Sequence, residues 1–274
     1  MSRPVPLHQV DAFTSEPFRG NPAAVCLLDG PREPAWMQSV AAEMNLAETA
    51  FLWREGDAHR LRWFTPTVEV PLCGHATLAS AHVLWSVGAV PPDAEIAFET
   101  LSGRLTAARD GEWIRLDFPA LPPRSEPGTP PPRLLDALGV ATAKVYEVPR
   151  PTASDGPSWL VELASEADVL GLQPDFGALA GIPGHAVIAT AQGSGAGRDF
   201  VSRFFAPKAG IDEDPVTGSS HCSLAPFWSA RLGRSELTGV QLSARTGIVR
   251  VRMCEARVEL SGRAVTVLRG ELLA

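Results

Sequence analysis

The sequence predicts an α+β protein of two similar lobes, each a mixed, mostly antiparallel sheet wrapped around one apolar helix. Two stretches share one plan: PLCGHATLASAHVLW from Pro71 and PVTGSSHCSLAPFW from Pro215. Each follows a similar approach, RWFTP from Arg62 or RFFAP from Arg203, then an acidic stretch, a Gly among small polar residues, and a helix-like run ending in Trp. Many connections between the expected strands are too short for parallel crossovers, which favours antiparallel pairing.

The two copies have diverged. Arg62 and Gly74 are 12 residues apart, whereas Arg203 and Gly218 are 15 residues apart. If the copies are structural repeats, we expect their glycine turns to face each other across the lobe interface. Two helix N-termini with free backbone N–H groups could then bind one anion from opposite sides.

The first half alternates short strands with two helices. Helical spacing predicts a helix over 34–45, with Asn45 as its stop. The run 75–89 is rich in Ala and Leu, contains no Pro and closes at Gly88, which predicts a helix buried on most faces. The expected strands are 5–13, 21–29, 48–56, 59–70, 95–100, 103–111 and 112–119.

The second half repeats this organisation. A helix is expected near 219–233, and the expected strands are 144–151, 158–165, 185–192, 199–207, 247–262 and 263–272. The densest proline cluster predicts a semi-rigid linker over 119–133. We therefore expect an N-terminal lobe over 1–118, which the strand 264–274 could complete, and a C-terminal lobe over 134–263.

Composition narrows the class of protein. The chain has 274 residues, 45% of them hydrophobic, a net charge of −7 and a pI near 5.4. These values predict a globular protein with small-molecule partners, without a nucleic-acid or membrane partner. No signal peptide or run of about 18 apolar residues is present, and the sparse cysteines form no CxxC pair, so we expect a cytoplasmic protein.

Three positions could carry acid-base or anion-binding chemistry in the first half. Gly74 lets the backbone approach a ligand closely, as Gly218 does in the second copy, with nearby hydroxyl donors expected from Thr77, Ser219 and Ser220. Glu48 is an isolated acid among apolar residues; it is either a solvated strand residue or a desolvated proton carrier. His75 follows Gly74 at a position that suits presentation to a cleft better than burial.

The second copy offers a different set. Asp214 could cap its turn, orient His75 across the interface, or share a proton with His75. Cys73 and Thr217 precede the two glycines; paired thiols there would make a two-base epimerase site, but the second thiol is absent. The four possible metal ligands do not match common zinc spacings, so we expect no metal site; they are Cys73, His75, His221 and Cys222. Nucleotide, nicotinamide, zinc-protease and GxSxG hydrolase motifs are absent.

These pieces together resemble a known family. The matching segments are VDAFTSEPFRGNPAAV, NLAETAFL, WFTPTVEVPLCGHATLASA, GIDEDPVTGSSH and SARTG, in order along most of the chain. They resemble the phenazine-biosynthesis F-like (PhzF-like) isomerases, within the wider diaminopimelate-epimerase-like fold. The resemblance implies an active site between two lobes, a homodimer, a small carboxylate substrate, and no metal or organic cofactor.

The resemblance also implies roles for individual residues. The family's acid-base glutamate falls on Glu48, its Gly-His pair on Gly74 and His75, and its aspartate and serine on Asp214 and Ser219. In the phenazine enzymes that glutamate moves a proton between carbons of a dihydro-hydroxyanthranilate. Turn amides around Gly74 and Gly218 would bind polar substrate groups and stabilise developing charge.

Cys73 departs from the phenazine-type pattern, in which a small apolar residue precedes Gly-His. It matches the catalytic Cys of epimerases and proline racemases, and with Thr217 it resembles the Cys/Thr arrangement of hydroxyproline dehydratases. An epimerase, racemase or dehydratase that uses Cys73 therefore stands as the alternative to the isomerase. A catalytically silent binding or interaction protein is the third hypothesis.

Overall fold

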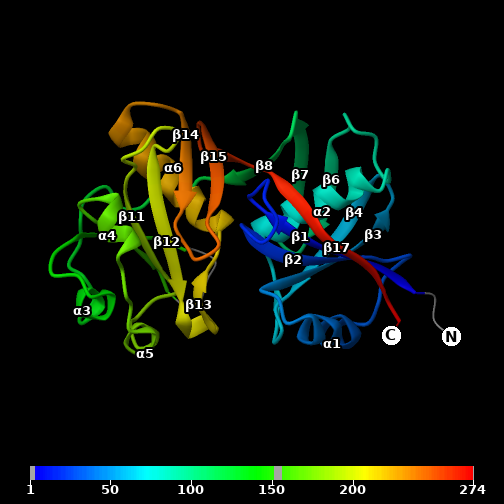
Figure 1. The fold of residues 1–274 in the computed structure, drawn as a ribbon, viewed down its shortest axis with the longest axis horizontal. Helices are drawn as coiled ribbons and strands as arrows, with labels where there is room; N and C mark the ends of the chain where they lie inside the picture. Colours follow the sequence, from blue (N-terminus) through cyan, green and yellow to red (C-terminus); the bar gives the residue numbers. More distant parts are fainter. Residues whose placement is uncertain (1–3, 151–155, 274) are drawn as a thin grey trace. The chain divides into compact units, whose positions relative to one another are not determined.

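The computed structural model describes residues 4–150 and 156–273 and divides the chain into two compact units (Figure 1). The first unit comprises Met1–Phe118 and Glu259–Ala274, and the second comprises Pro119–Val258. The proline-rich segment expected as a linker thus belongs to the second unit. Backbone hydrogen bonds explain this assignment, because the N–H groups of Ala120 and Leu121 donate to carbonyls of Ala256 and Cys222.

In the first unit, two crossovers connect parallel strands, and hairpins connect β3 with β4 and β6 with β7. Strand β2 is parallel to β3, β3 is antiparallel to β4, β4 is parallel to β6, and β6 is antiparallel to β7. Helix α1 (Pro34–Met44) makes the first crossover and α2 (Gly74–Ser86) the second. The strands are β1 (Val5–Ala12), β2 (Asn21–Leu27), β3 (Glu48–Glu55), β4 (Ala58–Phe64), β5 (Glu69–Val70), β6 (Ile96–Thr100), β7 (Gly103–Asp110), β8 (Trp113–Pro119), β16 (Arg257–Gly262) and β17 (Ala264–Leu272).

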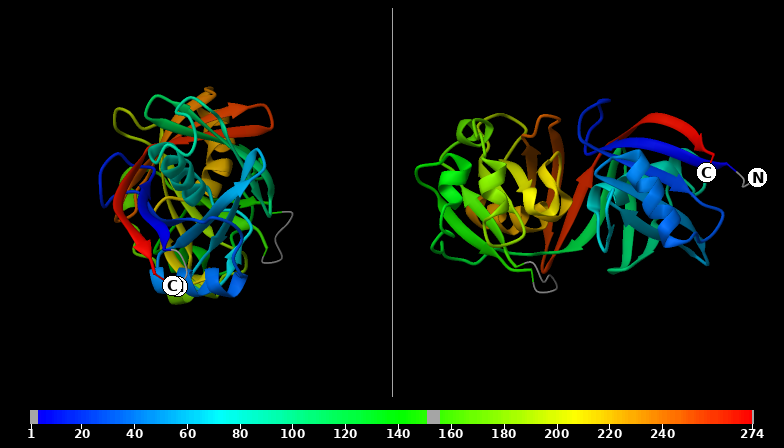
Figure 2. Two further views of the ribbon diagram at one scale, coloured as in Figure 1. Left: turned by 90° about the vertical axis from the view of Figure 1, so that its right-hand side faces the viewer. Right: turned by 90° about the horizontal axis from the view of Figure 1, so that it is seen from below.

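The last strand completes the first unit. Strand β17 pairs antiparallel with β1, from Val5 opposite Leu272 to Ala12 opposite Ala264 (Figure 2). Strand β16 pairs with β8, and Glu259 of β16 lies 3.6 Å from Arg115 of β8. Residues 259–263, expected in the C-terminal lobe, are therefore part of the first unit.

The second unit uses the same order of pairings. Strand β10 is parallel to β11, β11 is antiparallel to β12, β12 is parallel to β14, and β14 is antiparallel to β15. Helix α6 (Gly218–Leu232) makes the crossover that corresponds to α2. The other elements are α3 (Leu134–Leu138), β9 (Lys144–Val148), β10 (Ser158–Glu162), α4 (Glu166–Leu170), α5 (Phe176–Ala180), β11 (Val187–Gln192), β12 (Phe200–Ala206), the 3-10 turn η1 (Pro207–Ala209), β13 (Ile211–Asp214), β14 (Glu236–Gln241) and β15 (Gly247–Cys254).

The two corresponding crossover helices, α2 and α6, are mostly buried, as the apolar runs predict. Ten residues of α2 are buried, and α2 contacts β1, β2, β3 and β17 (Figure 1). Packing is close: a Cβ added at Gly262 would lie 2.4 Å from the Phe13 ring and 2.8 Å from Leu78. Helix α6 stays helical despite Pro226 in its interior. The α+β fold class predicted from the sequence is confirmed.

Some elements differ from the sequence expectation. Strand β14 was missed because Gly239 interrupts its apolar pattern, and α3, α4 and α5 have five residues each, too few to show a helical period. The strand expected over 144–151 ends at Val148 in β9, and Pro151 lies outside the described residues. Among the described residues, no helix is both long and apolar enough to cross a membrane.

Candidate active site

An arginine–glutamate pair braces the hairpin that leads into α2. Nε and Nη2 of Arg62 in β4 lie 2.7 Å from the two carboxylate oxygens of Glu69 in β5. The guanidinium also stacks over the Phe64 ring, 5.2 Å from its centroid. A bidentate pair of this kind fixes orientation as well as distance. It therefore holds the chain in place five residues before the helix begins at Gly74.

The second unit repeats this brace. Nε and Nη2 of Arg203 in β12 lie 2.7 and 2.9 Å from the carboxylate oxygens of Glu213 in β13, and the guanidinium lies 5.0 Å from the Phe205 ring centroid. Glu213 again stands five residues before the helix glycine, Gly218. The three extra residues of the second copy therefore lie in the hairpin loop around η1, and the final approach to the helix is equal in length.

Strand register identifies the position that corresponds to Glu48. The braced arginines pair with Phe51 in β3 and with Ala189 in β11. Three residues before these partners stand Glu48 in the first unit and Ala186 in the second. The duplicated frame thus places a carboxylate in one copy and a methyl group in the other.

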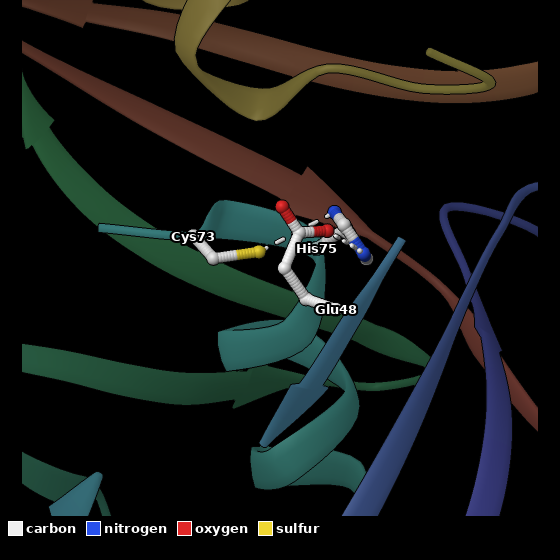
Figure 3. A group of neighbouring side chains, drawn as sticks. All are labelled: Glu48, Cys73 and His75. Carbon is white, nitrogen blue, oxygen red and sulfur yellow. Dashed lines mark hydrogen bonds and ion pairs between the residues drawn. The ribbon is translucent and has the colours of Figure 1, made fainter. Parts of the chain in front are cut away.

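Glu48 and His75 meet at the start of α2 (Figure 3). Glu48 is the first residue of β3, its side chain is 13% exposed, and its Oε2 lies 3.2 Å from Nε2 of His75. The carboxylate oxygen is out of line with the ring N–H direction, so this is a close contact without hydrogen-bond geometry. Glu48 is therefore not the outward-facing strand residue of the alternative interpretation.

His75 is buried, contrary to the expectation that this position is poor for burial. The helix start is enclosed by β2 and β3, which α2 contacts, and the imidazole is 6% exposed. Burial lowers the pKa of His75 to about 3, because the charged form loses its hydration. The imidazole is therefore neutral near neutral pH.

The second ring nitrogen of His75, Nδ1, contacts two further groups. Nδ1 lies 3.2 Å from Nδ2 of Asn21 and 3.5 Å from Sγ of Cys73. Cys73 is the N-cap residue of α2 and is buried, so its thiol points inward beside the ring. Asn21 was not among the predicted site residues, although it stands in the glycine-containing turn RGNP.

Glu48, Cys73 and His75 are all potential metal ligands, with ligand atoms within 4.8 Å of one another (Figure 3). The sulfur lies at Nδ1 of His75, however, whereas the carboxylate lies at Nε2. The imidazole thus contacts the thiol through one ring nitrogen and the carboxylate through the other.

The turn before α6 is held by a buried amide that the sequence analysis missed. Gln241 in β14 has no exposed surface. Its Nε2 donates to the carbonyl of Asp214 at 2.7 Å and to Oγ1 of Thr217 at 3.2 Å, and its Oε1 accepts from the Thr217 N–H at 2.9 Å. The Thr217 hydroxyl in turn donates to Oδ2 of Asp214. Thr217 and Asp214 therefore form one fixed unit.

The hydroxyl groups expected around the two turns differ in orientation. Thr77 and Ser220 turn inward and donate to the carbonyls of Cys73 and Thr217. Their hydroxyl protons are thus engaged by carbonyls at the starts of their own helices, which contradicts the expectation that they are ligand donors. Ser219 is exposed at the start of α6. Of the three hydroxyl groups, only that of Ser219 is presented outward.

Each unit thus assembles part of the predicted site. The first unit brings together Glu48, Cys73 and His75, next to the turn at Gly74. The second brings together Asp214 and Thr217, directly before Gly218 and Ser219. That the two sets act on one substrate stays a prediction.

The comparisons with known proteins identify the family of the chain. The family model described as phenazine biosynthesis-like protein matches residues 10–270. The chain is 47% identical over 268 residues to an uncharacterized isomerase from Halalkalibacterium halodurans, which covers 98% of both chains. Among solved structures, a PhzF-family protein from Enterococcus faecalis is 40% identical with a TM-score of 0.90, over 99% of this chain and 100% of that one.

A more distantly related solved structure shares this fold. A predicted epimerase from Pseudomonas aeruginosa is 21% identical with a TM-score of 0.75 and covers 100% of both chains, which shows a shared fold. The relatives named as isomerases and the shared epimerase-like α+β fold together show that the chain is an isomerase of that fold class. Within that class, the chain belongs to the phenazine biosynthesis-like (PhzF) family.

Proposed function

We propose that this isomerase moves a proton between carbons of a small, cyclic, carboxylate-bearing substrate, without a cofactor, and that Glu48 is its general acid/base. The observation that carries this proposal is the carboxylate of Glu48, mostly shielded from water and 3.2 Å from the imidazole of His75. A carboxylate that is held in place beside a neutral group is not kept ionised by a positive charge on that group. It can therefore accept a proton and return it.

The proposed reaction has a simple balance. The Glu48 carboxylate accepts a proton from one substrate carbon, and the electron pair of that C–H bond moves into the conjugated system. The carboxylic acid then returns the proton to a second carbon, so the double bond shifts and no external reactant is consumed. Backbone N–H groups at Gly74 and Gly218 would stabilise the negative charge that develops on the substrate. His75, Asp214 and Ser219 would position its substituents.

The test is NMR-monitored deuterium exchange in D2O, with small cyclic and amino-acid carboxylates as substrates. We expect wild-type protein to incorporate deuterium and the Glu48→Gln variant to lose this activity while it stays folded. Glu55→Gln is the matched control, because Glu55 ends the same strand with a side chain that is 53% exposed. Full exchange by Glu48→Gln would sink the assignment.

A second candidate is an amino-acid epimerase, racemase or dehydratase that uses Cys73. It is favoured by the 3.5 Å contact of the thiol with Nδ1 of His75, at a helix N-terminus that stabilises a thiolate. Against it, the Thr217 hydroxyl is engaged with Asp214 and Gln241. Loss of exchange in Cys73→Ala, together with full exchange in Glu48→Gln, would establish this candidate.

The partners are also proposed. We expect a homodimer in the cytoplasm that binds a small carboxylate and no nucleic acid, in keeping with the acidic charge. Light scattering of the purified protein tests the dimer. A ligand that binds tightly but is recovered without deuterium would instead favour the catalytically silent binding protein.

A further inference from the structure

We propose that Asn21 is a positioning residue that keeps the proton of the His75 ring on Nε2, the ring nitrogen nearest to Glu48, and withholds Nδ1 from the thiol of Cys73. This inference rests on the proposed function, in which Glu48 is the acid/base. It assigns a role to the turn RGNP, which the proposed mechanism leaves unused.

The contact between Asn21 and His75 has a defined donor and acceptor. Nδ2 of Asn21 lies 3.2 Å from Nδ1 of His75, and both residues are buried. An amide NH2 group can only donate, so Nδ1 must offer its lone pair. Because burial lowers the pKa of His75 to about 3, the neutral ring carries a single proton. That proton is therefore on Nε2, the nitrogen 3.2 Å from the Glu48 carboxylate.

The turn that precedes β2 fixes the position of Asn21. It opens β2 opposite Ala12 and directly follows Gly20, which has φ +63°. A Cβ at Gly20 would lie 2.1 Å from the carbonyl oxygen of Ala12, so only glycine fits this bend. Oδ2 of Asp11 accepts from the N–H of Phe18 at 2.7 Å and anchors the same loop. The amide is thus delivered to His75 by a constrained turn.

Asn21 and Cys73 compete for Nδ1 of His75. Sγ of Cys73 lies 3.5 Å from the nitrogen that accepts from Asn21. With that lone pair free, the S–H proton could transfer to Nδ1 and leave a thiolate beside an imidazolium, as in Cys–His nucleophile pairs. The amide of Asn21 occupies the lone pair and disfavours this transfer. Asn21 thereby favours carboxylate chemistry at Glu48 over thiol chemistry at Cys73.

The test reads the His75 tautomer directly and needs no substrate. Full-length protein labelled with 15N-histidine gives long-range 1H–15N correlations for each ring, and His75→Gln identifies the signals of His75. We expect an unprotonated Nδ1 and a protonated Nε2. His221 provides an opposite reference in the same spectrum, because its Nδ1 lies 2.8 Å from the carbonyl of Thr217 and must donate.

Asn21→Asp replaces the donor with an acceptor of the same shape. We expect the His75 proton to move to Nδ1 in this variant, while the His221 pattern is unchanged. Asn45→Asp, the same substitution at the C-cap of α1, should leave both rings as in wild type. A wild-type proton on Nδ1, or a His75 pattern unaltered by Asn21→Asp, would overturn the inference.

Asn21→Ala tests the competition separately. It should raise the rate of Cys73 alkylation by iodoacetamide about tenfold, because the thiol gains a base. Peptide mapping distinguishes Cys73 from the other cysteines. An unchanged alkylation rate would contradict the claim that Asn21 withholds Nδ1 of His75 from the thiol. If the Asn21 variants do not fold, the wild-type spectrum alone decides the tautomer. Since these readouts need no turnover, their failure is distinct from failure of the Glu48→Gln exchange test.

Discussion

The two units share one backbone arrangement but carry different side chains at the corresponding positions. Both brace a hairpin with a bidentate Arg–Glu pair and start a buried helix five residues after the glutamate. Register relates Glu48 to Ala186 and, through β2 and β10, Asn21 to Gly156. Counting from the glycines relates His75 to Ser219. The acid, the imidazole and its amide partner thus occur together in the first unit, and none has a counterpart of its type in the second.

A duplicated frame can therefore keep its backbone function in both copies while a carboxylate–imidazole pair such as Glu48 and His75 occurs at this place in only one of them. The second unit keeps the helix start and adds the Asp214–Thr217–Gln241 network. A symmetric two-base mechanism needs matched groups in both copies. The arrangement instead favours one proton carrier, so the comparison can be tested by moving or removing groups in either copy.

The largest expected effect comes from removing the acid. Glu48→Gln should lower the exchange rate by about 10²–10⁴-fold, the usual contribution of a general acid/base. The corresponding change in the second unit, Ala186→Gln, should leave the rate within a few-fold of wild type. Adding Ala186→Glu to Glu48→Gln should not restore activity, because Ser219 replaces the imidazole there. Restored exchange in the double variant would show that the two positions are equivalent.

A smaller effect is expected from the two braces. Arg203 also donates to the carbonyl of Leu172 at 2.8 Å and is less exposed than Arg62. Arg203→Gln should therefore lower the free energy of unfolding by about 3–4 kcal/mol, and Arg62→Gln by about 2–3 kcal/mol. Urea denaturation measures both. Equal losses would mean that the extra carbonyl contact contributes nothing.

The Gln241 network should contribute less than the Arg203 brace. Gln241→Leu leaves the Thr217 N–H and the Asp214 carbonyl without their buried partner, at a cost of about 1–3 kcal/mol in the free energy of unfolding. Gln241→Glu keeps the acceptor for the Thr217 N–H and loses the donor. It should also make ligand binding depend on pH, which titration of the variant against wild type would show.

The smallest effect concerns pH. Burial lowers the pKa of His75 to about 3 and of His221 to about 4, each from 6.5. Below pH 6.5 the unfolded chain therefore binds protons that the folded protein does not, and stability falls as the pH falls. Between pH 7 and 5.5 each residue should cost about 1 kcal/mol. A His75→Gln variant should show a flatter pH dependence of unfolding; an equally steep one contradicts its burial as the cause.

The sequence permits prediction of what depends on local chemistry. The α2 and α6 helices follow from apolar runs that begin at glycine, and the strand at Glu48 follows from its apolar neighbours. The buried contacts between distant residues could not be predicted, because they depend on which side chain of a neighbouring strand lies next to the site. Asn21 reaches His75 from 54 residues away, and Gln241 reaches Thr217 from 24 residues away. A single buried amide in a strand leaves no periodic signal that marks such a contact.

The pairing of β1 with β17 has a consequence for synthesis of the protein. Val5 and Leu272, at opposite ends of the chain, are partners in one ladder. On the ribosome, the second unit is therefore translated in full before the last strand of the first unit exists. Until those residues emerge, the edge of β1 that receives β17 has no native partner, and the nascent chain must protect it from other strands. Synthesis of the unit that carries Glu48 is thus interrupted by synthesis of the whole second unit.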